Sequence, residues 1–292
     1  GKTVHLGGNI GHNLFSRLNE IKADDYAVIE LSSFQLMKMS VSPDISVVTN
    51  LSPNHLDWHK DMQEYVDAKK NIFLHQNENG KTVLNASNKT TAALKELCKG
   101  KVITFGCDEG DFNIKEDGIY YQDTLVLKDC DILLPGAHNR QNYAAAIAAV
   151  DGLVTNEQIV TVAKSFGGVE HRIELVREKD GVKYYNSSID SSPSRTMAAL
   201  NSFSQKLIVI SGGYDKNIPL DPLGELFNQK VKTAILMGDT APKIKAVLKA
   251  HGFGGEIIDV NDMQEAVYTA HGLAKQGDIV ILSPAAASFD KY

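Results

Sequence analysis

Several residues that could bind a cation or a phosphate group lie close together in residues 49–73, TNLSPNHLDWHKDMQEYVDAKKNIF. His55, Asp57 and His59 follow an apolar run and a Ser-Pro-Asn turn, and the helix expected behind them carries Lys69. In open α/β sheets, ligands bind at the carboxyl ends of the strands. Imidazole and carboxylate groups at such a strand end suit a hard cation or a phosphate group better than a packed core.

The same loop has a simpler interpretation, in which it only caps the helix that follows. Asp61 or Asn54 would then be the cap, because their short side chains accept hydrogen bonds from the first helical amides. We expect His59 to lie at the surface, and Trp58 and Tyr65 to serve packing. The loop by itself leaves both interpretations open.

A second candidate is Glu30, near the end of the apolar run YAVIEL at residues 26–31. A near-continuous apolar run is typical of a parallel strand that is covered on both faces. A carboxylate inside such a run is costly unless it is paired or binds a metal ion. We therefore favour Glu30 as a Mg²⁺ ligand, the alternative being a helix cap or a salt-bridge partner.

Two further stretches could approach a ligand. The turn GGNIG at residues 7–11 lets the backbone come close to a bound group, although a tight strand-to-helix connection explains it equally well. A helix is expected to follow, from residue 12 to about residue 20. Asn139 and Asn142 lie three apart at the start of an alanine-rich helix, and so share one face. A helix N-terminus attracts anions, and amide side chains there can hold a nucleotide base or a phosphate. The alternative is that Asn139 caps the helix.

The elements that must position these residues alternate between strand and helix. Residues 111–131 and 173–185 are expected as antiparallel hairpins, the first with Glu116-Asp117-Gly118 and the second with Lys179-Asp180-Gly181 as its turn. The later apolar runs are followed by polar loops, as in a doubly wound parallel sheet. We predict an α/β protein: a partial central ATPase-type parallel sheet domain at 1–168, then a Rossmann-like doubly wound C-terminal domain at 169–292.

Composition excludes several classes of function. The 292 residues are 43% hydrophobic and 23% charged, which is ordinary for a soluble globular protein. The net charge of -6 argues against sequence-independent nucleic-acid binding, which needs a basic surface. The cysteines, Cys98, Cys107 and Cys130, are odd in number and lack metal-like spacing, which favours free thiols in a reducing cytoplasm. No apolar run approaches the roughly 20 residues that span a bilayer, and no signal peptide is visible.

Taken together, the motifs resemble those of the Mur ligase family. The matching stretches occur in the family's order over nearly the whole chain: GGNIG, IELSSFQL, TNLSPNHLDWH, YVDAKKNIF, LPGAHNRQNYAAA, HRIELV, GVKYYNSS, GGYDK and LSPAAASFD. The combination of ELSSFQL, NHLD and GAHNxxN is a specific signal, and ELSSFQ indicates the branch that adds D-glutamate. The resemblance implies an ATP-dependent amide-bond ligase of peptidoglycan synthesis, with ATP, Mg²⁺, UDP-N-acetylmuramoyl-L-alanine and D-glutamate as its ligands.

The resemblance also assigns roles to residues of this sequence. Glu30 and His55 would coordinate Mg²⁺, and Lys69 would be carbamylated, so that its new carboxylate helps to position the cation. Asn139, Asn142 and Arg172 would contact the nucleotide, and Asn9 would contact the muropeptide. Lys216 and Ser288 would hold the carboxylates of D-glutamate, with Ser191 and Phe289 nearby. We expect a monomer that binds neither nucleic acid nor membrane.

The chain departs from the family pattern in several places. The N-terminal UDP-binding domain, the glycine-rich phosphate loop and the last helix are absent, so we expect this chain alone to be inactive. Residues 186–191 read NSSIDS where the family usually has NDSKAT or NDSIAT. Ser187 thus stands where an aspartate is expected, and Ile189 where many members have lysine. Asp190 is a candidate to compensate for the missing aspartate. The alternatives are another Mur ligase, a folylpolyglutamate synthase-like ligase, or a non-catalytic nucleotide-binding relative.

Overall fold

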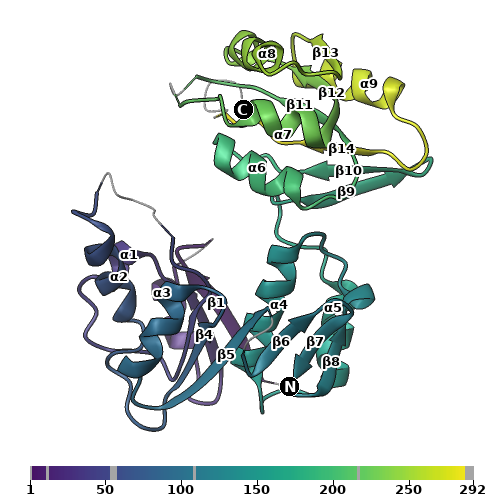
Figure 1. Cartoon of the computed structure of the whole chain (residues 1–292). Helices are drawn as coiled ribbons and strands as arrows, with labels where there is room; N and C mark the ends of the chain where they lie inside the picture. Colours follow the sequence, from purple (N-terminus) through teal and green to yellow (C-terminus); the bar gives the residue numbers. More distant parts are fainter. Residues whose placement is uncertain (1, 11–12, 53–57, 108–109, 216–217, 287–292) are drawn as a thin grey trace. The chain divides into compact units, whose positions relative to one another are not determined.

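The computed structural model describes residues 2–10, 13–52, 58–107, 110–215 and 218–286. The chain divides into two compact units, one of residues 1–130 with 140–159 and one of residues 131–139 with 160–292. Two helices, α4 (Ala137–Val150) and α5 (Asn156–Ser165), contribute residues to both units (Figure 1). The predicted boundary between residues 168 and 169 stays a prediction.

Within its described residues, the first unit holds two sheets and short helices. Its strands are β1 (Val4–Gly8), β2 (Tyr26–Glu30), β3 (Ile45–Val48), β4 (Lys81–Asn85), β5 (Lys101–Cys107), β6 (Phe112–Lys115), β7 (Gly118–Tyr121) and β8 (Thr124–Lys128). Its helices are η1 (Phe15–Glu20), α1 (Ser33–Leu36), α2 (Met62–Lys70), α3 (Lys89–Ala92), η2 (Ala93–Leu97) and η3 (Asp129–Asp131). The 3-10 helices are those labelled η.

The larger sheet of the first unit has the order β3-β4-β5-β6-β7-β8. Its strands are parallel from β3 to β6 and antiparallel from β6 to β8, which confirms the parallel sheet with a small antiparallel excursion. Tyr65 and Val66 of α2 pack on Val48, Leu84 and Phe73, because their spacing puts them on the sheet-facing side of the helix. Tyr65 therefore packs as expected.

The second unit is a doubly wound sheet. Its strands are β9 (Glu174–Lys179), β10 (Val182–Asn186), β11 (Leu207–Ser211), β12 (Val231–Leu236), β13 (Glu256–Asp259) and β14 (Ile279–Leu282). Its helices are α6 (Pro193–Asn201), α7 (Leu223–Lys230), α8 (Ala241–Ala250) and α9 (Met263–Leu273). The order β13-β12-β11-β14-β10-β9 is parallel except for the edge strand β9, as the sequence predicts.

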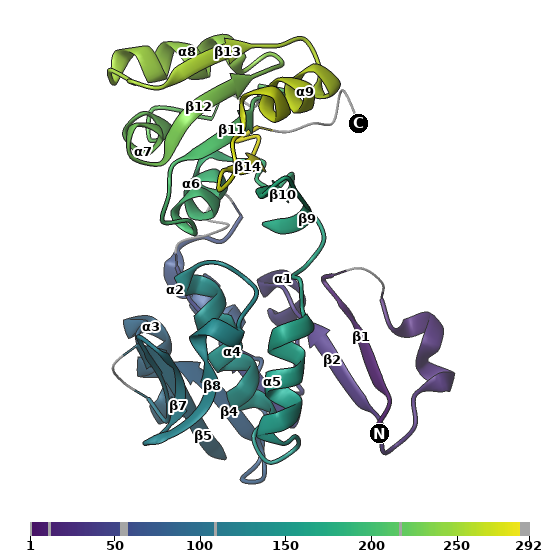
Figure 2. The same ribbon diagram turned by 90° about the vertical axis from the view of Figure 1, so that its right-hand side faces the viewer.

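Both faces of this sheet are covered by helices. Figure 2 shows the helices α6, α7, α8 and α9 around this sheet. Leu207 and Val209 of β11 belong to the core formed with α6, α7 and α8, whereas Ile208 and Ile210 belong to the core formed with α9. The alternation follows from the two-residue period of a strand. A strand buried on both faces is apolar at every position, which explains the run LIVIS.

The predicted turn of the hairpin β9–β10 is confirmed. Asp180 and Gly181 have φ angles of 53° and 73°, in the left-handed region that a two-residue hairpin turn of this kind requires. The first hairpin, between β6 and β7, turns at Glu116 and Asp117, also as predicted.

Two expectations about the N-terminal segment are wrong. The helix expected over residues 12–20 is only the 3-10 helix η1 in the described part, and it buries no residue, so no packing supports a longer helix. Strand β2 is exposed along its length, with Val28 and Ile29 at 52% and 48% exposure. Within the described residues β2 pairs with β1 alone, and its side chains stay exposed on both faces, whereas β1 alternates between exposed and buried residues.

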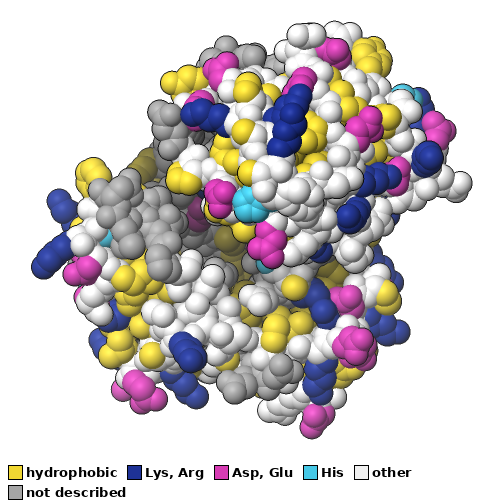
Figure 3. Space-filling model, turned by 45° about the horizontal axis from the view of Figure 1, so that its top comes forward, with side chains coloured by type: hydrophobic (Ala, Val, Ile, Leu, Met, Phe, Trp, Pro, Cys, Tyr) yellow, Lys and Arg dark blue, Asp and Glu magenta, His cyan; other side chains and the backbone are white. Residues whose placement is uncertain are grey.

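The surface carries charges of both signs. On the face shown in Figure 3, Lys and Arg side chains are dispersed among Asp and Glu side chains. Within the described residues, no helix is both long and apolar enough to cross a bilayer.

Candidate functional site

The first cluster of predicted residues lies where the ribbon β1–β2 ends. Gly8 is paired with Glu30 in the parallel register, and a Cβ at Gly8 would stand 2.2 Å from the Glu30 carbonyl oxygen. Only glycine fits this approach, and its φ of 106° also favours glycine. Asn9 then donates from its backbone amide to the Glu30 carbonyl at 2.7 Å, and from Nδ2 to Glu30 Oε1 at 3.1 Å. The glycine-rich turn thus brings Asn9 against Glu30.

Lys69 reaches the same strand end from α2. Its Nζ donates to the Leu31 carbonyl oxygen at 3.2 Å, one residue beyond Glu30. Burial lowers the pKa of Lys69, and the negative charge of Glu30 partly opposes this effect. A lowered pKa increases the fraction of neutral amine, the form that acts as a nucleophile.

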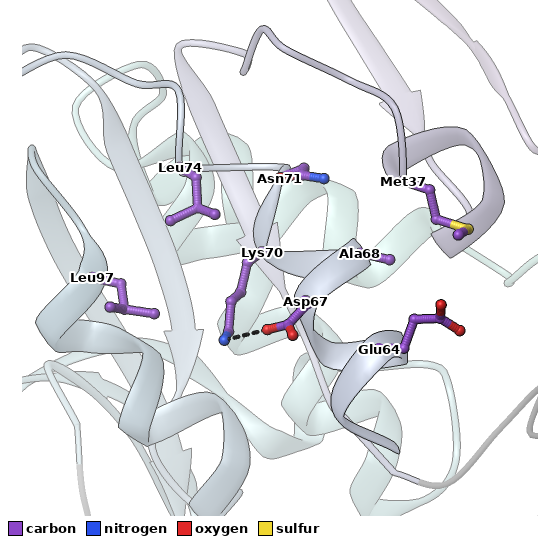
Figure 4. A pocket seen from close by; sticks show the side chains of 8 residues that line it. All are labelled: Met37, Glu64, Asp67, Ala68, Lys70, Asn71, Leu74 and Leu97. Atoms are coloured by element: carbon purple, nitrogen blue, oxygen red, sulfur yellow. Dashed lines mark hydrogen bonds and ion pairs between the residues drawn. The ribbon is translucent and has the colours of Figure 1, made fainter. Parts of the chain in front are cut away.

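The neighbouring Lys70 points elsewhere. Its Nζ pairs with Asp67 Oδ1 at 2.7 Å, and it lines a cavity of about 530 Å³ beside α2 (Figure 4). The lining residues are Met37, Glu64, Asp67, Ala68, Lys70, Asn71, Leu74 and Leu97. The two adjacent lysines therefore have different neighbours, and Lys69 is the one that lies beside Glu30.

The structure contradicts the expectation that Glu30 is a buried carboxylate, because Glu30 is exposed together with the whole of β2. Burial therefore gives no reason for a metal at Glu30. Within the described residues, no three His, Cys, Asp or Glu side chains are grouped closely enough to hold a metal ion. The predicted ligand His55 lies outside the described residues.

The expectation that His59 lies at the surface is also wrong. His59 is 2% exposed, and its Nε2 lies 2.9 Å from the Ser33 hydroxyl at the start of α1. The ring stacks on Phe34, with centroids 5.4 Å apart and an interplanar angle of 5°. His59 therefore anchors the turn that follows Glu30. Trp58, expected to pack, is 71% exposed and touches Phe34 only edge-on.

The cap expected at α2 is present. Asp61 accepts a hydrogen bond from the Glu64 amide at 2.9 Å, so the capping interpretation holds for Asp61. Because the cap and the Lys69 contact occur together, capping and a functional role for this stretch do not exclude each other.

The second cluster lies in the second unit, around the entry to β9. His171 and Ile173 have φ angles of 66° and 47°, which is unusual for non-glycine residues and an outlier for a β-branched one. Hydrogen bonds hold this backbone: the His171 amide donates to Glu174 Oε2 at 2.9 Å, and the His171 carbonyl accepts from the Ile189 amide at 3.2 Å. Strain of this kind persists where the surroundings enforce it, and it places the exposed Arg172 between two fixed residues.

The predicted nucleotide residues are positioned by the start of α4. Asn139 donates from Nδ2 to the Pro135 carbonyl at 2.8 Å, and its amide donates to the Gly136 carbonyl at 3.0 Å. Asn142 lies one turn further along α4 and is exposed. Partial burial and the positive charge of Arg172 lower the pKa of His138, which precedes Asn139.

A buried polar cluster, which we call the hydroxyl cluster, consists of Ser187, Asp190, Thr196 and Ser283. All four are at most 5% exposed. The Ser283 hydroxyl donates to Asp190 Oδ2 at 2.8 Å and lies 2.9 Å from the Thr196 hydroxyl, and Ser187 also hydrogen-bonds the Asp190 carboxylate. Burial raises the pKa of Asp190, which these hydrogen bonds and the charges of Arg195 and Arg172 oppose.

The remaining predicted substrate residues are described only in part. Ser191 is half-buried next to Asp190, and its amide donates to the Ile189 carbonyl at 2.7 Å. Lys216, Ser288 and Phe289 lie outside the described residues. The sequence interpretation did not find the hydroxyl cluster, although one signal was available: a single aspartate in the serine-rich loop NSSIDSSPS at the end of a strand.

Two family models match this chain. The Mur ligase middle domain matches residues 6–150, and the glutamate ligase domain of Mur ligases matches residues 171–286. The first match contains Asn9, Glu30 and Lys69, and the second contains Arg172 and the hydroxyl cluster.

Several similar sequences share one name. The chain is 50% identical to a UDP-N-acetylmuramoylalanine–D-glutamate ligase of Acetivibrio thermocellus over 300 residues, which cover 98% of this chain and 64% of the relative. It is 51% identical to the ligase of the same name from Clostridium beijerinckii over 299 residues, which cover 100% of this chain and 65% of the relative. The chain thus spans a little less than two thirds of these relatives.

Solved structures share the fold. UDP-N-acetylmuramate-alanine ligase MurC of Thermotoga maritima matches with a TM-score of 0.69 at 17% identity, over 97% of this chain and 72% of that protein. MurF ligase of Thermotoga maritima, in complex with ADP, matches with a TM-score of 0.66 at 19% identity, over 97% of this chain and 76% of that protein. The predicted α/β fold is confirmed by this likeness. The chain belongs to the Mur ligase family and contains its middle domain followed by its glutamate ligase domain.

Proposed function

We propose that this chain is part of an ATP-dependent ligase that adds D-glutamate to UDP-N-acetylmuramoyl-L-alanine during peptidoglycan precursor synthesis. The observation that carries the proposal is identity of about one half, over nearly the whole chain, to relatives named for this activity. Because the chain spans 64% to 65% of their length, the activity is proposed for the whole protein to which these residues belong.

The proposed reaction has two steps. A carboxylate oxygen of the muropeptide attacks the γ-phosphorus of ATP, the bond to the leaving ADP breaks, and an acyl phosphate forms. The amine of D-glutamate then attacks the carbonyl carbon, the carbon–oxygen bond to phosphate breaks, and the amide and inorganic phosphate are released. Phosphoryl transfer depends mainly on positioning and on neutralising charge, so cationic and amide side chains are the groups it needs.

The Glu30–Lys69 region supports a cation site. Mg²⁺ in phosphoryl-transfer enzymes usually takes one or two carboxylates together with substrate phosphates. Glu30 supplies one carboxylate, His55 is a predicted ligand, and carbamylation of Lys69 would supply the second. The reaction of Lys69 with CO₂ requires the neutral amine, and the lowered pKa of Lys69 favours it. Bound Mg²⁺ would neutralise charge on the phosphates.

The nucleotide and the substrates are assigned to the remaining predicted residues. Asn139 and Asn142 would face the nucleotide from the first turns of α4, where helix amides favour anions. Arg172, held between His171 and Ile173, would stabilise negative charge on the phosphates. Asn9 would contact the muropeptide beside Glu30. The D-glutamate pocket would consist of Ser191, Lys216, Ser288 and Phe289. We propose a cytoplasmic monomer.

The test is phosphate release by a completed enzyme. The segments of the Clostridium beijerinckii ligase outside the aligned region would be joined to this chain, and ATP, Mg²⁺ and UDP-N-acetylmuramoyl-L-alanine supplied with one amino acid at a time. The proposal expects release with D-glutamate, and none with L-glutamate, L-lysine or diaminopimelate. Release with another amino acid would assign the protein to a sister ligase. ATP binding without release would indicate a non-catalytic relative. The unextended chain serves as the control and is expected to release no phosphate.

A further inference from the structure

The hydroxyl cluster lies at the carboxyl ends of two neighbouring strands. β10 and β14 are parallel, and Asn186 is paired with Leu282 in their last register position. Ser187 and Ser283 follow these paired residues directly, and the Ser187 amide donates to the Leu282 carbonyl at 2.8 Å. Thr196 approaches from α6. The four side chains thus join the loop after β10, the loop after β14 and the first turns of α6. Figure 1 shows β10, β14 and α6 next to one another.

Asp190 is the centre of this junction. Its carboxylate accepts the hydroxyl of Ser283 at 2.8 Å and also bonds Ser187, so it connects the two loops directly. A buried carboxylate without partners is costly, and buried hydroxyls that lose their acceptor are costly as well. The arrangement is therefore stable only when both loops keep their positions. Asp190 holds them in place more strictly than an apolar contact would, because hydrogen bonds are directional.

The loop fixed in this way carries a predicted substrate residue. Ser191 follows Asp190, and its amide is held by the Ile189 carbonyl at 2.7 Å. We propose that Asp190 is a positioning residue of the amino-acid pocket, which fixes Ser191 and the residues 283–286 through the hydroxyl cluster. The identification of the amino acid as D-glutamate rests on the proposed function, whereas the anchoring of the two loops does not.

The departure from the family pattern fits the same role. The pattern NDSIAT has the carboxylate at the position of Ser187 and a small residue at that of Asp190, and this chain has the reverse arrangement. Because the side chains of Ser187 and Asp190 hydrogen-bond each other, they border one buried space. A carboxylate on either residue can reach this buried space. The serine at position 187 and the aspartate at position 190 therefore compensate each other.

Hydrogen exchange on this chain tests the anchor without any catalysis. Asp190→Ala is expected to accelerate exchange of the Ser187 and Ser283 amides at least tenfold, since both loops lose their common acceptor, while β12 amides keep their rates. The double variant Ser187→Asp/Asp190→Ala is expected to return both amides to within threefold of the original rates. Ser187→Asp alone, which places two carboxylates together, is expected to be at least as disturbed as Asp190→Ala.

Kinetics in the completed enzyme test the pocket. Asp190→Ala should raise the KM for D-glutamate at least tenfold and change the KM for ATP less than twofold, and the double variant should reverse the change. Leu248→Ala is the matched control, because it removes a buried apolar side chain of α8 and lowers the melting temperature without touching the cluster. It should leave the KM for D-glutamate unchanged.

Several results would overturn the proposal. These are unchanged exchange of Ser187 and Ser283 in Asp190→Ala, a failure of the double variant to recover, or equal rises of both KM values as in a generally destabilised enzyme. If the unmodified completed enzyme shows no release that depends on D-glutamate, the proposed function fails. The exchange rates alone then decide whether Asp190 anchors the two loops.

Discussion

The chemistry proposed for Lys69 depends on its surroundings. The Lys69 side chain is half-buried, and its Nζ donates a hydrogen bond to the Leu31 carbonyl oxygen. The negative charge of Glu30 also interacts with it. Burial favours the neutral amine, and the nearby carboxylate limits the effect. Lys70 has the same intrinsic chemistry, but it is paired with Asp67 on another side of α2. We therefore expect two identical side chains in adjacent positions to differ in reactivity because of the groups that each contacts.

Substitution of these lysines distinguishes the proposed catalytic role of Lys69 from the ion pair of Lys70 with Asp67. In the completed enzyme, Lys69→Ala is expected to lower D-glutamate-dependent phosphate release by about 100-fold or more, which is typical for the loss of an electrostatic group at a reacting centre. Short carboxylic acids should restore part of the rate by supplying the lost carboxylate. Lys70→Ala, the matched control, should change the rate less than about threefold, since a surface ion pair contributes little. Equal losses in both variants would contradict the assignment.

The raised pKa of Asp190 predicts a pH dependence of stability. A folded-state pKa above the unfolded value of about 3.9 means that the folded protein binds more protons above that pH. The stabilisation from protonated Asp190 is therefore complete below pH 4 and is lost as the pH rises through the folded-state pKa. Arg172 and Arg195 face the group and oppose the shift.

The measurement compares this chain with Asp190→Asn, which cannot titrate. The free energy of unfolding of the unmodified chain, minus that of the variant, should fall as the pH rises from about 4. Urea unfolding at several pH values between 4 and 8 gives this difference. Asp180→Asn, which removes an exposed carboxylate of the same unit, corrects for the change in net charge. A difference that grows with pH would show that Asp190 is stabilised in its charged form.

At the scale of elements, the ribbon β1–β2 determines where Asn9 and Glu30 lie. It is a two-stranded parallel ribbon in which β2 is exposed throughout and β1 alternates between exposed and buried residues, and its end depends on the close approach of Gly8 to the Glu30 carbonyl. A short ribbon has little stability of its own. The position of Asn9 relative to Glu30 is therefore sensitive to single changes in the backbone.

Gly8→Ala should open the end of this ribbon. The new Cβ would meet the Glu30 carbonyl at 2.2 Å, and the φ of 106° disfavours alanine in addition. Hydrogen exchange of the Asn9 amide, bonded to that carbonyl at 2.7 Å, should accelerate at least tenfold. Gly152→Ala is the matched control, with a positive φ of 81° and no atom within 4 Å of the added Cβ. If the control accelerates exchange at Asn9 equally, the close approach is not the cause.

At the scale of the whole molecule, each unit has a hydrophobic core of its own among the described residues. Phe73 and Tyr65 belong to a core of the first unit, and Phe227 and Leu207 belong to a core of the second. Each core is formed by a sheet with the helices that cover it. A change in one core should therefore act mainly on its own unit.

Phe227→Ala tests this independence. The side chain is 0% exposed, and its loss should cost the second unit about 3–5 kcal/mol. Hydrogen exchange should accelerate in β11 and β12 and stay unchanged in β4 and β5. Phe73→Ala is the reciprocal variant and should give the opposite pattern. Equal acceleration in both units would show that they unfold as one.

The sequence alone determined the fold class, the order of the elements and the hairpin turn at Asp180-Gly181. These follow from local rules: apolar periodicity, the continuous apolar runs of covered strands, and the conformations that glycine permits. The family motifs also predicted Glu30, Lys69, Asn139 and Arg172 as site residues, because each motif consists of residues that are neighbours in the sequence. Their roles stay predictions.

Only the tertiary structure decided which side chains meet. An apolar run at residues 26–31 predicted a buried Glu30, yet exposure depends on which elements pack on the faces of β2, and that is not a local property. His59 looked like a surface residue until its contact with Ser33, twenty-six positions away, was known. The bond between Asp190 and Ser283 spans ninety-three positions. Burial, hydrogen-bond partners and pKa shifts arise from contacts between distant residues, which a linear pattern does not record.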